Sequence, residues 1–198
     1  MTIENPKKVR LTHTICFMFS GKAGVGKSYS ADLMKLMTEE YNLNSIKAPF
    51  ADGVKATARF MGWDGKKDQK GRRLLQRIGQ AGREYDEDLW VKATMDIIEN
   101  SDAYPYDVVF VDDWRFPNEI SYIKKNELLY KPISIRITAP ERELLVGTPE
   151  YIEVSEISLD DYGKFDFHIN NKKDCTVPIE VQLRHILNSV IENFNTNQ

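Results

Sequence analysis

The sequence predicts a three-layer α/β protein, with a central parallel sheet and helices on both sides. Two observations lead to this prediction. Apolar runs of strand length alternate with stretches of helical periodicity. The run at 14–19 is apolar on both faces, as in a central parallel strand, and the run at 107–112 carries β-branched residues and ends in carboxylates, as in a second buried strand. The chain has 198 residues, which suits one domain or one domain with a small inserted lobe.

The elements follow in a regular order. The first strand, 14–19, ends in Ser20-Gly21, and a helix with apolar residues every three or four positions then runs from Lys27 to a stop at Asn42. A short strand at 45–48 precedes a long polar and helical region at 51–100. We then expect a strand at 107–112, a helix at 118–125, a strand at 133–138, a loop-rich stretch to 163, a short strand at 165–169 and a terminal helix at 179–194.

Composition excludes several classes of protein. Hydrophobic residues make up 41% of the chain and charged residues 29%, which excludes disorder for most of it. The net charge of -3 argues against a general nucleic-acid binder, so an anionic ligand would have to be held by locally clustered charge. Cys16 and Cys175 are expected to be reduced thiols, residues 1–10 lack the apolar segment of a secretory leader, and no apolar run is long enough to span a bilayer. We therefore expect a cytoplasmic protein that does not associate with membranes.

A glycine-rich turn joins the first strand to the first helix. Residues 21–28 read G-K-A-G-V-G-K-S and satisfy the G-x-x-x-x-G-K-[ST] pattern of a phosphate-binding loop. Such a loop turns successive backbone N–H groups towards a phosphate, and the following helix adds the positive end of its dipole. We expect Lys27 to reach the β- and γ-phosphates of ATP and the Ser28 hydroxyl to bind Mg²⁺. The expected ATP site is Gly21, Lys22, Ala23, Gly24, Val25, Gly26, Lys27, Ser28 and Tyr29.

Two carboxylates follow the strand at 107–112. Asp112 and Asp113 are placed to hold Mg²⁺ directly or through water, although an acidic residue at a strand end is often only a solvated cap. Arg115 is placed to neutralise a phosphoryl group during transfer. The expected metal ligands are Ser28 and Asp113.

Two short motifs suggest a GTPase instead. Residues 171–174 match the N-K-x-D signature with which GTPases read guanine, and residues 160–163 match D-x-x-G. In a GTPase, however, the D-x-x-G aspartate ends the apolar strand beside the phosphate loop, whereas here it lies in a polar stretch just before N-K-x-D. The spacing therefore disfavours a GTPase.

The segment 66–83 is basic in an otherwise acidic chain. For Lys66, Lys67 and Lys70 we favour a solvated helix face. For Arg73, Gln80 and Arg83 we favour anion binding, because they flank Gly79 and Gly82, where we expect a helix to end and the backbone to approach a ligand. The acidic residues 86–88 are typical of a helix N-terminus, and Trp90 is as consistent with a core position as with a ligand contact.

Taken in order, several pieces of the chain resemble the phage-type deoxynucleoside monophosphate kinases, a branch of the P-loop nucleoside monophosphate kinases. The pieces are the loop 21–28, F-A-D-G-V-K at 50–55, R-R-L-L-Q at 72–76 running to Gly79, W-V-K at 90–92, D-W-R at 113–115 with Glu119, S-E at 155–156, and the strand end at 167–171. Together they cover most of the chain. The first is common to all P-loop proteins, and the middle three together look specific to this family.

The resemblance implies one P-loop kinase domain over residues 1–198, with an inserted acceptor-nucleotide lobe at 50–100 and a lid-like region at 139–163. It implies that Lys27, Asp113, Arg115 and Arg142 are catalytic. The implied acceptor-binding residues are Lys55, Arg73, Gly79, Gln80, Arg83, Trp90, Asp113 and Glu119. Gln80 stands where the family usually has a small hydroxyl residue, Arg142 is the lone arginine of the lid, and Lys92 is also consistent with a structural role.

The expected reaction is transfer of the γ-phosphoryl group of ATP, with Mg²⁺, to a deoxynucleoside 5′-monophosphate. None of the three histidines is expected to act as a base, because an acceptor phosphate that is already a dianion needs none. The partners expected are small-molecule nucleotides and no stable nucleic acid, with the chain a monomer or homodimer, in the host cytoplasm if it is phage-encoded. Two alternatives remain open, a P-loop kinase for a non-nucleotide acceptor and a non-catalytic nucleotide-binding module.

Overall fold

The computed structural model describes residues 9–195. Most of the predicted polar N-terminus, at residues 1–8, lies outside this range. By internal contacts the chain divides into two units, one formed by the residues up to Lys47 together with those from Pro105 on, and the other by Ala48–Tyr104. Within the described part of the chain, no helix combines the length and the apolar character needed to cross a membrane.

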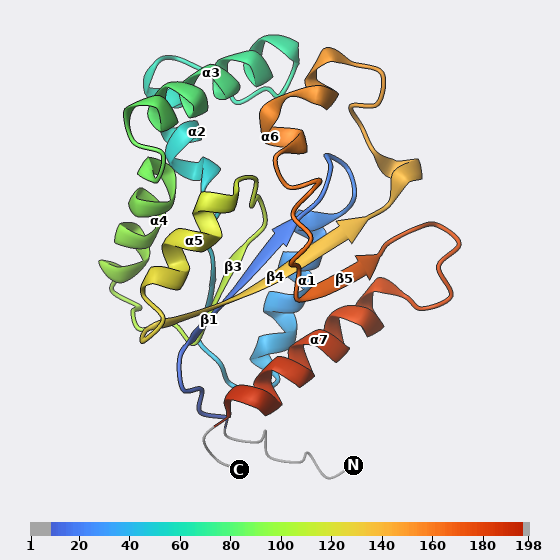
Figure 1. Cartoon of the computed structure of the whole chain (residues 1–198). Helices are drawn as coiled ribbons and strands as arrows, with labels where there is room; N and C mark the ends of the chain where they lie inside the picture. The colour runs from blue at the N-terminus through green and yellow to red at the C-terminus, as the bar shows by residue number, and fades with distance from the viewer. Residues whose placement is uncertain (1–8, 196–198) are drawn as a thin grey trace. The chain divides into compact units, whose positions relative to one another are not determined.

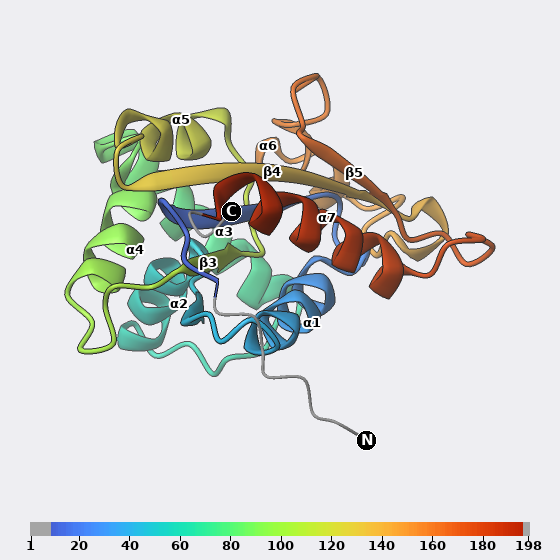
Figure 2. The same ribbon diagram turned by 90° about the horizontal axis from the view of Figure 1, so that it is seen from below.

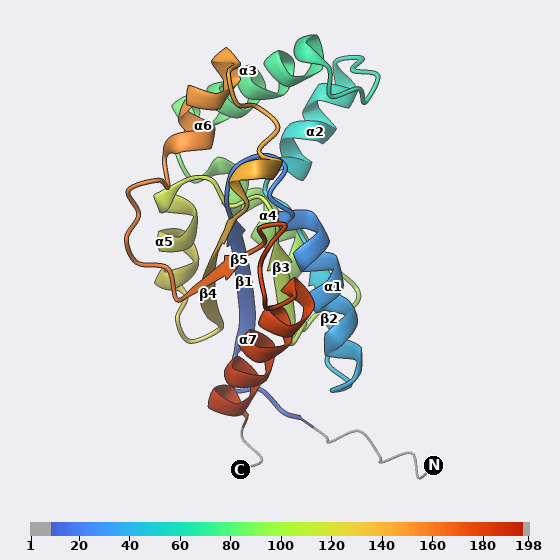
Figure 3. The same ribbon diagram turned by 90° about the vertical axis from the view of Figure 1, so that its right-hand side faces the viewer.

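The first unit is built on a parallel five-stranded sheet with the order β2-β3-β1-β4-β5. The strands are β1 (Thr14–Ser20), β2 (Ser45–Lys47), β3 (Val108–Val111), β4 (Tyr130–Thr138) and β5 (Phe167–Asn170). Helix α5 (Pro117–Lys125) covers one face, and helices α1 (Lys27–Glu39) and α7 (Ile179–Phe194) cover the other (Figures 2 and 3). The three-layer α/β fold with a central parallel sheet is therefore confirmed.

The centre of the sheet is the most buried part of this unit. Residues 15–19 of β1 are at most 1% exposed, because β1 is hydrogen-bonded on both edges and covered on both faces. Phe17 pairs with Phe110 of β3 and Ile133 of β4, and the rings of Phe17 and Phe110 stack with their centroids 5.5 Å apart. This core fixes the register of β1 and β3, and hence the relative positions of the loops that follow them.

The second unit is helical. It contains α2 (Ala51–Phe60), α3 (Gln69–Tyr85) and α4 (Leu89–Glu99), which pack on one another. The expectation that a helix ends near Gly79 and Gly82 is wrong, because α3 continues through both glycines to Tyr85. The indole of Trp90 explains Gly82, since a Cβ there would lie 2.4 Å from Cζ2 of that ring. The indole Nε1 also donates a hydrogen bond to the Gly79 carbonyl at 2.9 Å.

The segment between β4 and β5 has little regular structure. It holds two short 3-10 helices, η1 (Pro140–Arg142) and η2 (Pro149–Ile152), and one short α-helix, α6 (Val154–Ile157). The predicted lid-like region at 139–163 corresponds to this segment in sequence, and its action as a lid stays a prediction.

Candidate active site

The phosphate loop lies between the end of β1 and the start of α1, in the blue region of Figure 1. Gly21, Gly24 and Gly26 all have positive φ, at 146°, 94° and 102°, a region that L side chains rarely adopt. A Cβ would also lie 2.4 Å from the Ile137 carbonyl oxygen at Gly21 and 2.2 Å from the Arg142 carbonyl oxygen at Gly24. Glycine is therefore required at Gly21 and Gly24 for two reasons, the positive φ of the turn and the close approach of β4 and η1 to the phosphate loop.

Lys27, the first residue of α1, is 9% exposed. Its ammonium group donates to the carbonyls of Gly21 at 2.7 Å and Lys22 at 2.8 Å, so these two hydrogen bonds hold it against the phosphate loop. Burial, and next the positive charge of Arg115, lower the pKa of Lys27 to about 7, against the opposing effect of nearby carboxylates. A polyphosphate beside this nitrogen would favour the charged form, so the electrostatics of the loop suit an anionic ligand.

Asp112 and Asp113 lie at the carboxyl end of β3, beside β1 in the sheet. Asp112 is buried and forms an ion pair with Lys47 at 3.1 Å, whereas Asp113 is half-buried. The strand order reverses between β1 and β3, and in open parallel sheets ligands bind at the carboxyl ends of strands at such a reversal. The phosphate loop and the two carboxylates therefore share the edge of the sheet where the fold predicts a ligand site.

Trp114 fixes the chain between Asp113 and Arg115. Its ring is fully buried against Tyr162 and Phe165, with centroid distances of 5.2 and 5.4 Å, and its Nε1 donates to the Phe116 carbonyl at 2.8 Å. Neighbouring residues of an extended chain point in opposite directions. A buried Trp114 therefore leaves its two neighbours available to the site.

Arg115 forms an ion pair with Glu156 of α6 and also donates to the Ser155 carbonyl at 3.1 Å. Glu156 accepts a further hydrogen bond, at 3.2 Å, from the backbone N–H of Ala23 in the phosphate loop. One carboxylate thus links the arginine that follows β3 to the loop that follows β1. Glu156 belongs to the S-E piece of the family resemblance, from which no role was predicted for it.

Asp160 forms a second link to the phosphate loop. It accepts from Lys22 at 2.5 Å and from Arg136 of β4 at 2.7 Å. Burial raises the pKa of Asp160, but the hydrogen bonds from Lys22 and Arg136 outweigh it and hold the pKa below its ordinary value. Asp160 and Arg136 were not predicted as site residues. Asp160 is the aspartate of the D-x-x-G motif, and the spacing of that motif along the sequence does not predict its contact with the phosphate loop.

Asn171 forms the third link. It is 8% exposed at the end of β5, and its side-chain amide donates to the Val25 carbonyl of the phosphate loop at 2.9 Å. Its Oδ1 accepts from Arg142 at 3.4 Å. The N-K-x-D segment that sequence spacing disfavoured as a GTPase motif is therefore in direct contact with the loop.

Two predicted site residues of this unit have other prominent contacts. Glu119 is buried at the start of α5, where its carboxylate accepts the backbone N–H groups of Arg115 at 2.9 Å and Phe116 at 3.0 Å. These bonds cap the helix and hold Arg115 in place. Tyr29 is exposed, and its hydroxyl donates to Glu180 of α7 at 2.9 Å.

The remaining predicted residues belong to the helical unit. Lys55 forms an ion pair with Asp52 at 2.6 Å, and Gln80 donates to Glu84 at 3.0 Å on the exposed surface. Arg83 lies against Gly79, because a Cβ on that glycine would be 3.4 Å from its guanidinium. The structure thus places Trp90, Gly79 and Arg83 side by side within this unit.

Arg73 lines a pocket of about 610 Å³ in the same unit. The other lining residues are Met61, Gly62, Trp63, Asp64, Asp68, Lys70, Gly71, Leu74 and Arg77. Lys70, Arg73 and Arg77 supply positive charge, Asp64 and Asp68 supply negative charge, and Trp63 supplies an aromatic ring. Trp63 and Arg77 were not predicted as site residues, although Arg77 lies one helical turn beyond Arg73.

The donor set around the phosphate loop suits Mg²⁺. The exposed Ser28 hydroxyl and the half-buried Asp113 carboxylate are oxygen ligands of the kind that Mg²⁺ prefers. Within residues 9–195 no three His, Cys, Asp or Glu side chains form a metal-binding group. Mg²⁺ in phosphoryl-transfer sites is typically held by one or two protein oxygens together with the substrate phosphates.

The strand order, the loop after β1 and the carboxylates after β3 together define the P-loop NTPase fold. No model of a known protein family matches the sequence. The chain is 29% identical over 150 residues to the uncharacterized protein ORF77 of Ictalurid herpesvirus 1 (strain Auburn). That match takes in 73% of this chain and 58% of the viral protein, so it spans less than two thirds of that relative.

Solved structures similar to this chain include the APS kinase CysC of Mycobacterium tuberculosis. Its Cys556Ala mutant has a TM-score of 0.46 at 13% identity, over 90% of this chain and 97% of that one. The same enzyme in complex with AMPPNP and APS has a TM-score of 0.45 at 13% identity, over 90% and 98%. The protein APE1195 also gives 0.45 at 13% identity, over 94% and 98%. Likenesses at this level give no basis for assigning a reaction or a ligand to this chain.

Proposed function

We propose that this protein transfers the γ-phosphoryl group of ATP to the 5′-phosphate of a deoxynucleoside monophosphate, giving a deoxynucleoside diphosphate and ADP. The observation that carries the proposal is the group of charges around the phosphate loop. Lys27 is buried within that loop, Asp112 and Asp113 end the neighbouring strand, and Arg115 follows them. This is the arrangement of cations and carboxylates that phosphoryl transfer requires.

In the proposed reaction, an oxygen of the acceptor phosphate forms a bond to the γ-phosphorus. The bond from that phosphorus to the β,γ-bridging oxygen breaks, and its electron pair remains on the departing ADP. The backbone N–H groups of the loop and Lys27 would bind the donor phosphates, and Arg115 would offset charge on the transferring group. Mg²⁺, held by Ser28 and Asp113, would supply charge neutralisation and orientation when bound.

Glu156 and Glu119 would act by positioning. Glu156 binds both Arg115 and the Ala23 N–H, so it holds the arginine at the phosphate loop. Glu119 binds the backbone N–H of Arg115 and so fixes where that side chain begins. Arg142 contacts Asn171 and would add positive charge next to the loop.

Two features of the helical unit support a nucleotide as acceptor. The pocket beside Arg73 offers Trp63 for contact with a base and two arginines for a phosphate. The resemblance of the segments at 50–55, 72–79 and 90–92 to phage-type deoxynucleoside monophosphate kinases favours the same acceptor.

The test is a coupled assay of ADP formation with each deoxynucleoside and ribonucleoside monophosphate in turn. We expect monophosphate-dependent ADP release by the wild-type chain. We expect Lys27→Ala to lower kcat at least about a hundredfold, since the cation that stabilises the transferring charge is removed. Lys35→Ala, on the same helix, is the matched control and should retain wild-type activity. Equal turnover by Lys27→Ala and the wild type would overturn the assignment. If no nucleoside monophosphate stimulates ADP release, the nucleotide substrate is refuted.

A further inference from the structure

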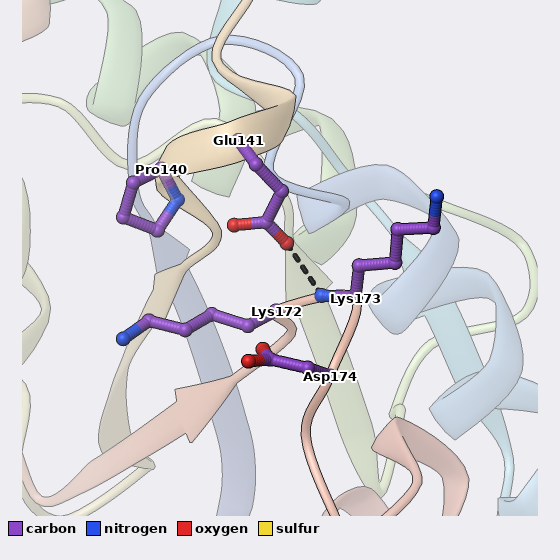
Figure 4. Close-up of a pocket in the computed structure, with 5 residues that line it drawn as sticks. All are labelled: Pro140, Glu141, Lys172, Lys173 and Asp174. Atoms are coloured by element: carbon purple, nitrogen blue, oxygen red, sulfur yellow. Dashed lines mark hydrogen bonds between the residues drawn. The ribbon is translucent and has the colours of Figure 1, made fainter.

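A wide, open pocket of about 730 Å³, lined mainly by charged residues, lies at the carboxyl end of β5. It is lined by Pro140 and Glu141 of η1 on one side and by residues 172–174 on the other. In Figure 4 the side chains of Lys172 and Asp174 extend to the same side of their loop, whereas Lys173 points away from them. The backbone N–H of Lys173 donates to Glu141 at 2.5 Å, so the two walls are joined at one point.

Both walls of this pocket are fixed to the phosphate loop. Asn171, immediately before Lys172, donates from its buried amide to the Val25 carbonyl. On the other wall, the Arg142 carbonyl is so close to Gly24 that no Cβ fits there, and the Leu144 N–H donates to the Ala23 carbonyl at 3.0 Å. A nucleotide whose phosphates bind the loop would therefore have this pocket beside it as a place for its base.

The chemistry of the pocket favours one base. Among residues 9–195 the Asp174 carboxylate has neither a hydrogen-bond nor an ion-pair partner, so both of its oxygens are available as acceptors. Guanine presents two adjacent donors, N1–H and N2–H, which match the two oxygens of one carboxylate. Adenine presents one donor, N6–H, beside the N1 acceptor, and that lone pair would face a carboxylate oxygen. A bidentate, charge-assisted pair thus forms with guanine alone.

The sequence motif agrees with this geometry. Residues 171–174 read N-K-K-D, and the spacing that argues against a GTPase concerns the hydrolytic D-x-x-G segment, not the recognition of a base. The structure places this motif at the end of a strand of the sheet, and its first residue contacts the phosphate loop.

We propose that the donor pocket accepts guanine through Asp174, so that GTP serves as a phosphoryl donor for this chain alongside ATP. The inference rests on the proposed function, since it assigns the base specificity of the same donor site. The bonds that form and break are those of the proposed reaction, with GDP in place of ADP as the leaving group.

The experiment compares GTP, ATP and xanthosine triphosphate as donors with the wild-type chain and with Asp174→Asn. Xanthine carries N1–H beside a C2 carbonyl, which matches the acceptor and donor of an asparagine amide. We expect Asp174→Asn to lower kcat/KM for GTP about ten- to a hundredfold and to gain use of xanthosine triphosphate. We expect kcat/KM for ATP to stay the same or to rise, because an amide can accept from N6–H and donate to N1 of adenine. Asp161→Asn, an exposed aspartate outside the pocket, should leave all three donors unchanged.

The other outcomes separate the two proposals. If the wild type uses ATP and does not use GTP, or if Asp174→Asn lowers both donors equally without gaining xanthosine triphosphate, the guanine pocket is refuted and the kinase assignment stands. If no triphosphate supports transfer, the kinase assignment fails. Displacement of a fluorescent guanine nucleotide by GDP then decides the pocket, because competition that is unaffected by Asp174→Asn overturns it and weaker competition supports it.

Discussion

Gly82 and Gly79 lie one helical turn apart in α3, and an alanine substitution is expected to destabilise the protein at Gly82 and to be neutral or stabilising at Gly79. An alanine in a helix interior is favoured over glycine by about 1 kcal/mol, which applies equally to both positions. At Gly82, however, the new Cβ would lie 2.4, 2.6 and 2.7 Å from three atoms of the Trp90 indole. At Gly79 the nearest atom is at 3.4 Å and belongs to the flexible end of Arg83.

The magnitude follows from these contacts. Overpacking of this kind costs about 1–3 kcal/mol, and displacing the indole would weaken its hydrogen bond to the Gly79 carbonyl, worth about 0.5–1.5 kcal/mol. After the helix-propensity gain of about 1 kcal/mol, Gly82→Ala should lower the free energy of unfolding by about 0.5–3.5 kcal/mol. Gly79→Ala should change it by less than about 0.5 kcal/mol or raise it by up to about 1 kcal/mol.

The assay is urea unfolding followed by tryptophan fluorescence and far-ultraviolet circular dichroism. We expect a lower midpoint for Gly82→Ala with an unchanged slope, because its effect is on the folded state. If Gly82→Ala proves as stable as Gly79→Ala, the packing of Trp90 on Gly82 cannot be the reason for glycine at that position, and the reasoning is refuted.

Three further predictions follow from the contacts of the phosphate loop. Asn171→Ala should lower the free energy of unfolding by about 1–3 kcal/mol, because it leaves the Val25 carbonyl without its buried donor, whereas the exposed Asn100→Ala should change it little; equal midpoints in urea would contradict this. The carboxylate of Asp160 has a lowered pKa, so its contribution to stability is present above its unfolded pKa and is lost as the pH falls; the difference in melting temperature between wild type and Asp160→Asn should shrink between about pH 5 and pH 3, and a constant difference would refute the ion-pair explanation. Removal of divalent cations with EDTA should abolish phosphoryl transfer and leave the circular dichroism spectrum unchanged, and full activity in EDTA would exclude the Ser28 and Asp113 metal site.

The sheet of this protein could be predicted from sequence, because its central strands are apolar on both faces. The strand expected at 14–19 is observed as Thr14–Ser20, and the helix expected at 179–194 is observed at those residues. The phosphate loop could be predicted for a related reason, since its glycines are required locally by the backbone turn.

The side-chain links that surround the loop could not be predicted in the same way. Glu156, Asp160 and Asn171 reach it across 133, 138 and 146 residues of chain, and no local periodicity records such contacts. Gly82 was misread for a similar reason. A glycine in a helical pattern suggests a helix end until the distant ring that packs on it is known, here that of Trp90.

The most direct test of the proposed function is the fate of the γ-phosphorus. The purified chain is incubated with ATP labelled at that position, Mg²⁺ and each deoxynucleoside monophosphate, and the products are separated by chromatography. The account predicts label in a deoxynucleoside diphosphate with at least one acceptor, and label that forms at least about a hundredfold more slowly with Lys27→Ala. Label that appears only in inorganic phosphate, or that stays in ATP with every acceptor, would contradict it.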